Sequence, residues 1–176
     1  MASGANRPAF WATAALVIVG DLATKLLAVS SLTRLPVPIG GEWLTLRLVY
    51  NPGAAFGINV GPYSRQVFMV LALVALGVLL TMVKQTRPEQ WFRLTALGLV
   101  CGGAVGNLID RVRSPRGVVD FIDVGIGAYR WPTFNVADMA VTCGAIALAV
   151  VLWQEGRPEP AVASDAAPDA AHPLES

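Results

Sequence analysis

The stretch VFMVLALVALGVLLTMV, residues 67–83, contains no charged side chain. A helix that crosses the hydrocarbon core of a bilayer needs about 20 mostly apolar residues. Together with the residues just before it, this stretch reaches that length over residues 64–83. It predicts a transmembrane helix and so indicates an integral membrane protein.

Three further segments have the length and apolar character of a transmembrane helix. They cover residues 10–29, 91–110 and 134–153. The composition agrees, because 55% of the residues are hydrophobic and only 14% are charged, far from the average soluble domain. The first segment has no clear cleavage site, so we interpret it as a retained helix and not as a signal peptide. We predict an all-α membrane protein, a four-transmembrane-helix bundle that forms one domain over residues 1–154.

Two of the connections between the predicted helices are long. The first contains LTLRLVY, residues 44–50, in which leucines alternate with other residues as in a β-strand. We therefore predict a small extracytoplasmic β-sheet between the first two helices. Four spans place both chain ends and the link at residues 84–90 on one side of the membrane, and the density of basic residues in that link favours the cytoplasm. The cytoplasmic tail over residues 155–176 is rich in Pro, Ala and Asp and is predicted to be disordered.

The composition also argues against several classes of function. A net charge of +1 without a basic run gives no sign of a nucleic-acid partner. The single histidine, His172, lies in the tail, which argues against a histidine zinc site or a Ser–His catalytic arrangement. Cys101 and Cys143 lie inside apolar segments, where the role of a small buried hydrophobic residue is favoured. The sequence therefore predicts no metal site.

Ionisable residues inside predicted spans are costly and mark candidate functional sites. Asp21 and Lys25 lie four residues apart and share one helix face in the favourable acid-first order. Two interpretations remain open: an ion pair that makes a charged helix tolerable, or a pair that faces the bundle interior and positions a substrate loop or a neighbouring polar segment. Asn107, Asp110 and Arg111 cluster at the end of the third span, either as a polar helix end or as part of a polar interior.

Asp120 and Asp138 are the best candidates for acid–base chemistry. Asp138 lies near the start of the fourth span, and Asp120 is followed by apolar residues. Two carboxylates that are close together in a low dielectric cannot both ionise easily, so they share a proton, as in aspartic proteases. The residues alone leave open catalysis, translocation of protons or cations, and a structural role. Asp123, beside Gly125, is interpreted as a loop carboxylate.

Five motifs occur in a fixed order along the four predicted spans. They are DLATK, NPGAAFGI, GGAVGNLIDR, VVDFIDV and FNVADMAVTCG, which begin at residues 21, 51, 102, 118 and 134. Their combination, from about Asp21 to Leu152, closely resembles the bacterial lipoprotein signal peptidase family (signal peptidase II, aspartyl peptidase family A8). The resemblance implies that Asp120 and Asp138 are the catalytic aspartates that activate water, whereas Asp123 has no catalytic counterpart. The positions that it implies for substrate binding or support of the site are Asn51, Gly53, Asn107, Asp110, Arg111, Asn135, Asp21 and Lys25.

The resemblance also implies a reaction and a location. The expected substrates are diacylglyceryl-modified prolipoproteins, cleaved just before the lipidated lipobox cysteine without a metal or an organic cofactor. The protein is expected in the bacterial cytoplasmic (inner) membrane, with the active site facing the periplasm or cell exterior and with cytoplasmic termini. Sensitivity to globomycin is expected as well. The implied partners are these substrates and the lipid bilayer, with no nucleic acid and no obligate protein partner.

Two other classes of protein remain as alternatives. A small proton-coupled transporter or channel subunit would use Asp21, Lys25, Asp110 and Asp138 as a relay, which predicts carboxylates spread through the depth of the membrane. A structural membrane scaffold predicts that asparagine in place of Asp120 or Asp138 acts as a mild polar substitution. Cleavage of a lipidated substrate distinguishes the peptidase from both.

Overall fold

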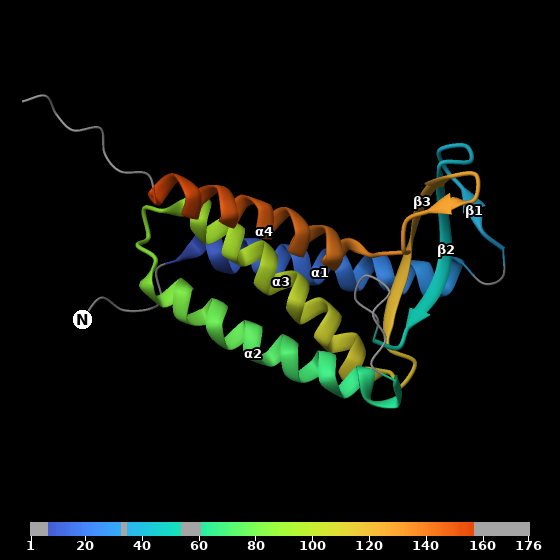
Figure 1. Cartoon of the computed structure of the whole chain (residues 1–176), viewed down its shortest axis with the longest axis horizontal. Helices are drawn as coiled ribbons and strands as arrows, with labels where there is room; N and C mark the ends of the chain where they lie inside the picture. The colour runs from blue at the N-terminus through green and yellow to red at the C-terminus, as the bar shows by residue number, and fades with distance from the viewer. Residues whose placement is uncertain (1–6, 33–34, 54–60, 157–176) are drawn as a thin grey trace, which may run out of the picture.

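The computed structural model describes residues 7–32, 35–53 and 61–156. Within these residues it forms four long helices and a four-stranded antiparallel sheet (Figure 1). Residues 54–58 of the NPGAAFGI motif and the predicted disordered tail beyond residue 156 lie outside the described residues. The elements are α1 (Pro8–Ser31), β1 (Val37–Pro38), β2 (Leu44–Asn51), the short 3-10 helix η1 (Gly61–Tyr63), α2 (Ser64–Gln85), α3 (Trp91–Arg113), β3 (Val118–Ile126), β4 (Tyr129–Arg130) and α4 (Val136–Glu155).

The four predicted transmembrane segments are all helices, and each helix is long and apolar enough to cross a membrane. Local signals set where they begin. Pro8 stands in the first turn of α1, where its missing N–H costs no hydrogen bond. At the start of α4, the Asn135 side chain and the backbone N–H of Asp138 bond to each other, while the Asp138 side chain bonds the Asn135 N–H. This capping box fixes the first turn of α4.

Helix α3 is the central element of the bundle and contacts α1, α2 and α4. In its most apolar part 44% of the residues are buried, against 6% in α2. Glycines allow this close packing. A Cβ at Gly103 would overlap the carbonyl oxygen of Ala137 on α4, and a Cβ at Gly106 would lie 2.5 Å from Asp21 Oδ2 on α1. The small residues of α3 therefore bring α1 and α4 close to its backbone.

The sheet has the strand order β1-β2-β3-β4. The predicted sheet is confirmed, and the structure extends it, because β3 and β4 come from the connection between α3 and α4. The sequence of β3, VVDFIDVGI, is rich in β-branched and aromatic residues. Its two aspartates, Asp120 and Asp123, interrupt the apolar run of this strand. Asp123 lies on β3, so its interpretation as a loop residue was wrong.

The sheet lies at one end of the helix bundle, next to the end of α1 and the start of α4 (Figure 1). The start of α1, the link between α2 and α3, and the end of α4 lie at the opposite end. Ala28 of α1 and Leu32, the residue just after this helix, pack against Phe121 of β3 in a buried apolar cluster. This cluster attaches the sheet to the bundle and places β3 beside the polar residues of the helices.

Candidate active site

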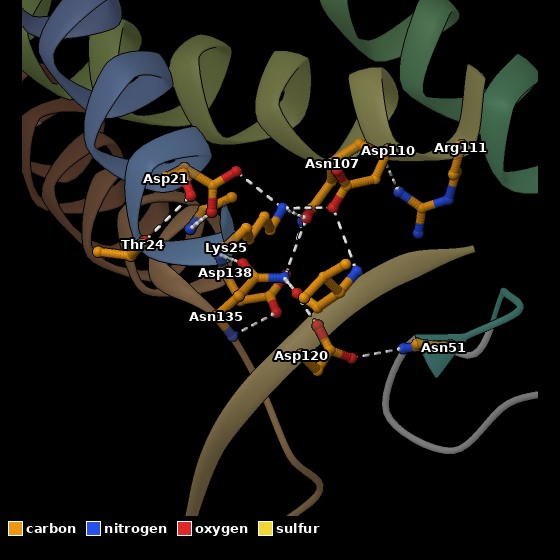
Figure 2. A network of polar contacts seen from close by, with 12 residues as sticks. Asp21, Thr24, Lys25, Asn51, Asn107, Asp110, Arg111, Asp120, Asn135 and Asp138 are labelled. Atoms are coloured by element: carbon orange, nitrogen blue, oxygen red, sulfur yellow. Dashed lines mark hydrogen bonds and ion pairs between the residues drawn. The ribbon is translucent and has the colours of Figure 1, made fainter. Parts of the chain in front are cut away.

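Asp120 and Asp138 meet where the sheet joins the bundle (Figure 2). Asp120 lies on β3 and is only 2% exposed, and Asp138 lies in the first turn of α4. Asn135 links the two carboxylates, because its backbone N–H donates to Asp138 Oδ2 at 3.1 Å and its side-chain nitrogen donates to Asp120 Oδ1 at 2.7 Å. The structure thus brings together the two residues that the sequence identifies as a candidate acid–base pair.

The other oxygen of Asp120 is held from the neighbouring strand. Asn51, the last residue of β2, donates from Nδ2 to Asp120 Oδ2 at 3.1 Å. The pairing of Val49 with Asp120 follows a register shift between Leu46 and Val49. This irregularity determines which residues of β2 lie opposite Asp120. Asn51 therefore reaches the site because of the strand register.

Gly53 supports Asn51 from the turn that follows β2. Its backbone N–H donates to Asn51 Oδ1 at 3.1 Å. Gly53 has a φ of +128°, and a Cβ there would lie 2.8 Å from the backbone carbonyl carbon of Ser64. The position requires glycine for both reasons. Its contribution to the site is to orient the Asn51 amide.

Asp138 accepts hydrogen bonds on both of its oxygens. Asn107 of α3 donates from Nδ2 to Oδ1 at 2.8 Å, and the Asn135 N–H donates to Oδ2. The second bond belongs to the capping box, so the carboxylate also lies at the positive end of the α4 dipole. The start of the helix thus fixes Asp138 in one orientation.

Three asparagine amides present their NH₂ groups to the carboxylate pair, and a donor fixes the oxygen of each. Asn51 Oδ1 accepts from Gly53, and Asn135 Oδ1 accepts from the backbone N–H of Asp138 at 2.9 Å. Asn107 Oδ1 accepts from Lys25 Nζ at 3.0 Å. An amide whose oxygen faces a donor must turn its nitrogen to the other side. Both carboxylates are therefore surrounded by donors of known orientation.

Burial and charge shift the titration of Asp120. Burial raises the pKa of Asp120 from 3.8 to about 6, and the negative charge of Asp138 adds to this rise. The amide donors of Asn51 and Asn135 and the positive charge of Lys25 oppose it without cancelling it. Asp120 therefore keeps a proton at a pH where an exposed aspartate has lost it. A pair with one shared proton is the state that acid–base catalysis by two carboxylates needs.

The charged residues of α1 belong to the same network. Lys25 Nζ lies 2.7 Å from Asp21 Oδ2, as an ion pair without regular hydrogen-bond geometry, and 2.9 Å from Asp110 Oδ2. Asp21 Oδ1 accepts a hydrogen bond from the backbone N–H of Ala137 at 2.9 Å, next to Asp138 in α4. The pair is thus an ion pair that faces the bundle interior, where Asp21 also bonds the first turn of α4.

Asp110 and Arg111 join α3 to the rest of the cluster. Asp110 Oδ2 accepts from the backbone N–H of Val119 on β3 at 3.1 Å. Arg111 Nη1 donates to the carbonyl oxygen of Asn107 at 3.1 Å, and its guanidinium lies 5.8 Å from the ring centre of Phe68. Asp110 therefore fixes the strand beside Asp120, while Arg111 enters the cluster through a backbone carbonyl.

Sequence reasoning missed the surroundings of Asp123. This carboxylate is 4% exposed, and its oxygens lie 3.1 Å from Arg47 Nε and 3.0 Å from Arg130 Nε. Arg47 also donates to Thr133 in the segment that leads to α4. Asp123 thus ties β2 to the end of the sheet. The β-branched character of β3 was the signal that could have placed it on a strand.

Most carboxylates of the cluster lie near the sheet: Asp120 on β3, Asp138 in the first turn of α4, and Asp110, which bonds β3. A transporter relay predicts carboxylates spread through the membrane depth, and of this cluster Asp21 lies deeper in the bundle. Within the described residues, no group of three or more His, Cys, Asp or Glu side chains is arranged to hold a metal ion. One buried and one half-buried carboxylate, Asp120 and Asp138, with fixed amide donors can hold one proton between them and activate a water molecule. The geometry therefore favours hydrolytic acid–base chemistry.

Known proteins resemble this chain in sequence and in fold. The family model described as signal peptidase (SPase) II matches residues 13–154. A lipoprotein signal peptidase from Treponema denticola is 43% identical over 154 residues, which cover 81% of this chain and 87% of the relative. One from Rhodococcus jostii is 44% identical, with 78% of this chain and 69% of the relative covered. Among solved structures, a bacterial membrane enzyme determined by the in meso method is 30% identical with a TM-score of 0.74, and the match covers 87% of this chain and 93% of that chain.

Proposed function

Because the chain belongs to the signal peptidase II family of membrane proteases, we propose that it removes the signal peptide from diacylglyceryl-modified prolipoproteins. Cleavage falls just before the lipidated lipobox cysteine. The observation that carries the proposal is the link through Asn135, which bonds Asp120 with its side chain and Asp138 with its backbone. The lipid chains of such a substrate stay in the bilayer, so the scissile bond is met where the helices end and the sheet begins.

The proposed reaction uses one ionised and one protonated carboxyl group. The carboxylate takes a proton from water, the water oxygen attacks the peptide carbonyl carbon, and the carboxylic acid gives its proton to the carbonyl oxygen. When the C–N bond breaks, the proton first taken from water passes to the leaving nitrogen. The other carboxylate takes a proton from the tetrahedral intermediate as its C=O bond re-forms. The pair ends as it began, with one shared proton.

The other residues of the cluster serve this pair in the proposed function. Three amides hold the carboxylates, and the remaining members fix those amides, the strand or the start of α4. The supporting residues are Asn51, Gly53, Asn107, Asp110, Arg111, Asn135, Asp21 and Lys25. We assign the peptidase domain to residues 1–154. Glu155, which the sequence placed at the start of the tail, is the last residue of α4.

The proposed location is the bacterial cytoplasmic membrane, with the sheet facing the periplasm or cell exterior and the termini in the cytoplasm. The long connections contain many arginines, which complicates a charge count based on the positive-inside rule. Several of these arginines have local partners: Arg47 and Arg130 bind Asp123, and Arg65 donates to the carbonyl oxygen of Arg111 at 2.7 Å. These arginines are therefore explained by their structural contacts and need not mark a cytoplasmic side. Their presence beside the sheet is thus compatible with the proposed orientation.

The substrate is tested with purified protein in detergent or lipid. The protein is expected to release the signal peptide from a diacylglyceryl-modified prolipoprotein and to leave the same unlipidated protein intact, with mass spectrometry of the products as the measurement. Globomycin is expected to stop the reaction. Equal cleavage of both substrates would contradict the proposed specificity. No cleavage by folded protein would contradict the peptidase function itself.

The pH dependence of the reaction follows from Asp120. Because the pKa of Asp120 is raised to about 6, the proton needed by the carbonyl oxygen is present below that pH and lost above it. We expect kcat/KM, which reports the free enzyme, to fall about tenfold per pH unit above about pH 6. The measurement is kcat/KM from pH 4.5 to 8.5 under conditions in which the protein stays folded. A value that rises steadily through this range would contradict the shared proton.

A further inference from the structure

We propose that Lys25 is a positioning residue that acts through the Asn107 amide and makes Asp138 the carboxylate that takes the proton from water, leaving the shared proton on Asp120. The inference rests on the proposed two-carboxylate reaction and adds an assignment of roles within it. Its physical basis is a chain of two hydrogen bonds, from Lys25 on α1 to Asn107 on α3 and from Asn107 to Asp138 in the first turn of α4 (Figure 2).

The first step is the orientation of the Asn107 side chain. Lys25 Nζ is only a donor, and it lies 3.0 Å from one end of the Asn107 amide. That end must therefore be the oxygen, and the NH₂ end must face Asp138, to which it donates at 2.8 Å. A backbone N–H fixes the orientation of Asn51 and of Asn135, whereas a charged side chain fixes Asn107.

Asn135 alone does not fix the Asn107 amide. Its side-chain nitrogen approaches Asn107 Oδ1 at 3.1 Å, but it also donates to Asp120 at 2.7 Å and approaches the carbonyl oxygen of Val119 at 3.3 Å. Two hydrogens face three acceptors, and the shortest contact goes to Asp120. The ammonium group of Lys25, which is 3% exposed, supplies the charge-assisted bond that holds the oxygen of Asn107 in place.

The second step is the difference between the two carboxylates. Asp138 lies at the N-terminus of α4 and receives a backbone N–H in addition to the Asn107 amide, so its negative charge is favoured. Asp120 lies on a strand, without a helix dipole, and is 2% exposed. Of the two, Asp138 is the better site for the negative charge. The charged groups around the pair are Lys25 and Asp21 from α1 and Asp110 and Arg111 from α3.

The location of the proton is tested without substrate, by infrared spectroscopy of the carboxylic acid band near pH 5.5. Asp120→Asn is expected to remove a band that Asp138→Asn only weakens, because burial, the largest cause of the raised pKa of Asp120, is left in place. Adding Asn107→Ala to Asp120→Asn should create a new band, because Asp138 then loses its amide donor while the ion pairs of Lys25 stay intact. A further Asp138→Asn change should remove that band. A band lost in Asp138→Asn and retained in Asp120→Asn would overturn the assignment.

The role of Lys25 is tested by a double-mutant cycle in cleavage kinetics. Lys25→Met and Asn107→Ala are each expected to lower kcat about 100-fold with little change in KM, because the general base is no longer held in place. The double variant should be no slower than the slower single variant, since both changes interrupt one chain of contacts. Losses that multiply, or a Lys25→Met variant with the wild-type kcat, would overturn the relay.

Arg93→Met is the matched control for loss of an ion pair. Arg93 Nη1 lies 2.8 Å from Glu155 Oε2 at the end of the bundle away from the sheet, and its side chain is 18% exposed. This variant is expected to keep the wild-type kcat even where it lowers the thermal unfolding temperature. If Lys25→Met does not fold, the infrared arm with Asn107→Ala decides the proposal, because it leaves Lys25 in place. Because the infrared experiment uses no substrate, it tests the location of the proton even if the proposed substrate is wrong.

Discussion

Replacing Asp120 or Asp138 with asparagine is expected to lower the rate of signal-peptide cleavage at least about a thousandfold. Each substitution keeps the size of the side chain but removes one of the two groups that carry protons to and from the substrate. The double variant is expected to be no slower than the single ones, because the two carboxylates act as a unit. The measurement is the initial rate of signal-peptide release from a lipidated prolipoprotein.

Asp123→Asn is the matched control for these two variants. Asp123 is 4% exposed and lies on the same strand as Asp120, but its oxygens bind Arg47 and Arg130. The control variant should therefore keep most of the wild-type rate. If it were as slow as Asp120→Asn, the loss of any buried charge in the sheet would explain the result, and the catalytic assignment would be contradicted.

The Asp120→Asn variant should stay folded at neutral pH. Because the pKa of Asp120 is raised from 3.8 to about 6, the free energy of unfolding falls as the pH rises between these values. Above that range ionisation costs up to about 3 kcal/mol, which asparagine avoids. One amide donor loses its acceptor, an opposing cost of about 1–3 kcal/mol. Thermal unfolding close to that of the wild type would thus separate lost chemistry from lost folding.

Exchanging Asn135 for serine should separate the start of α4 from the chemistry. Asn135 is fully buried, and its side chain both caps the helix and donates to Asp120. A serine hydroxyl can still accept from the backbone of Asp138, so most of the cap is retained. The serine side chain does not replace the hydrogen bond from the Asn135 amide to Asp120. The cleavage rate is therefore expected to fall about 100-fold.

Asn135→Ala completes this comparison. It removes the cap as well, so it should lower the cleavage rate to a similar extent and cost about 1 kcal/mol more in stability than serine does. Cleavage rate and thermal unfolding are measured on both variants. A fully active serine variant would show that the reaction does not need the bond from this amide to Asp120.

Hydropathy alone was enough to locate the four helices. A spanning helix needs a long apolar run, and the segments at residues 64–83 and 91–110 have one whatever their neighbours are. The strand β2 was also readable, because its leucines alternate. Alternation did not reveal β3, since this strand is nearly continuously buried from Val118 to Asp123, and its β-branched and aromatic residues were the remaining signal.

The contacts of the site were harder to predict than its members. Periodicity shows that Asp21 and Lys25 share a helix face, but it does not show which other helix that face meets. The contact between Lys25 and Asn107 joins residues 82 positions apart. The bond from Asn51 to Asp120 depends on the register shift within β2, which no local pattern encodes. The family resemblance identified these residues, whereas the structure shows how they are connected.

The contacts of α1 have a consequence for the order in which the protein is synthesised. Asp21 and Lys25 leave the ribosome long before their partners, since Asn107 follows Lys25 by 82 positions and Ala137 follows Asp21 by 116. An unpaired charge at the centre of an inserting helix costs about 3 kcal/mol. Because the two residues stand one turn apart, α1 carries its own counter-ion into the bilayer. The charges of Asp21 and Lys25 therefore compensate each other within α1 before α3 and α4 are translated.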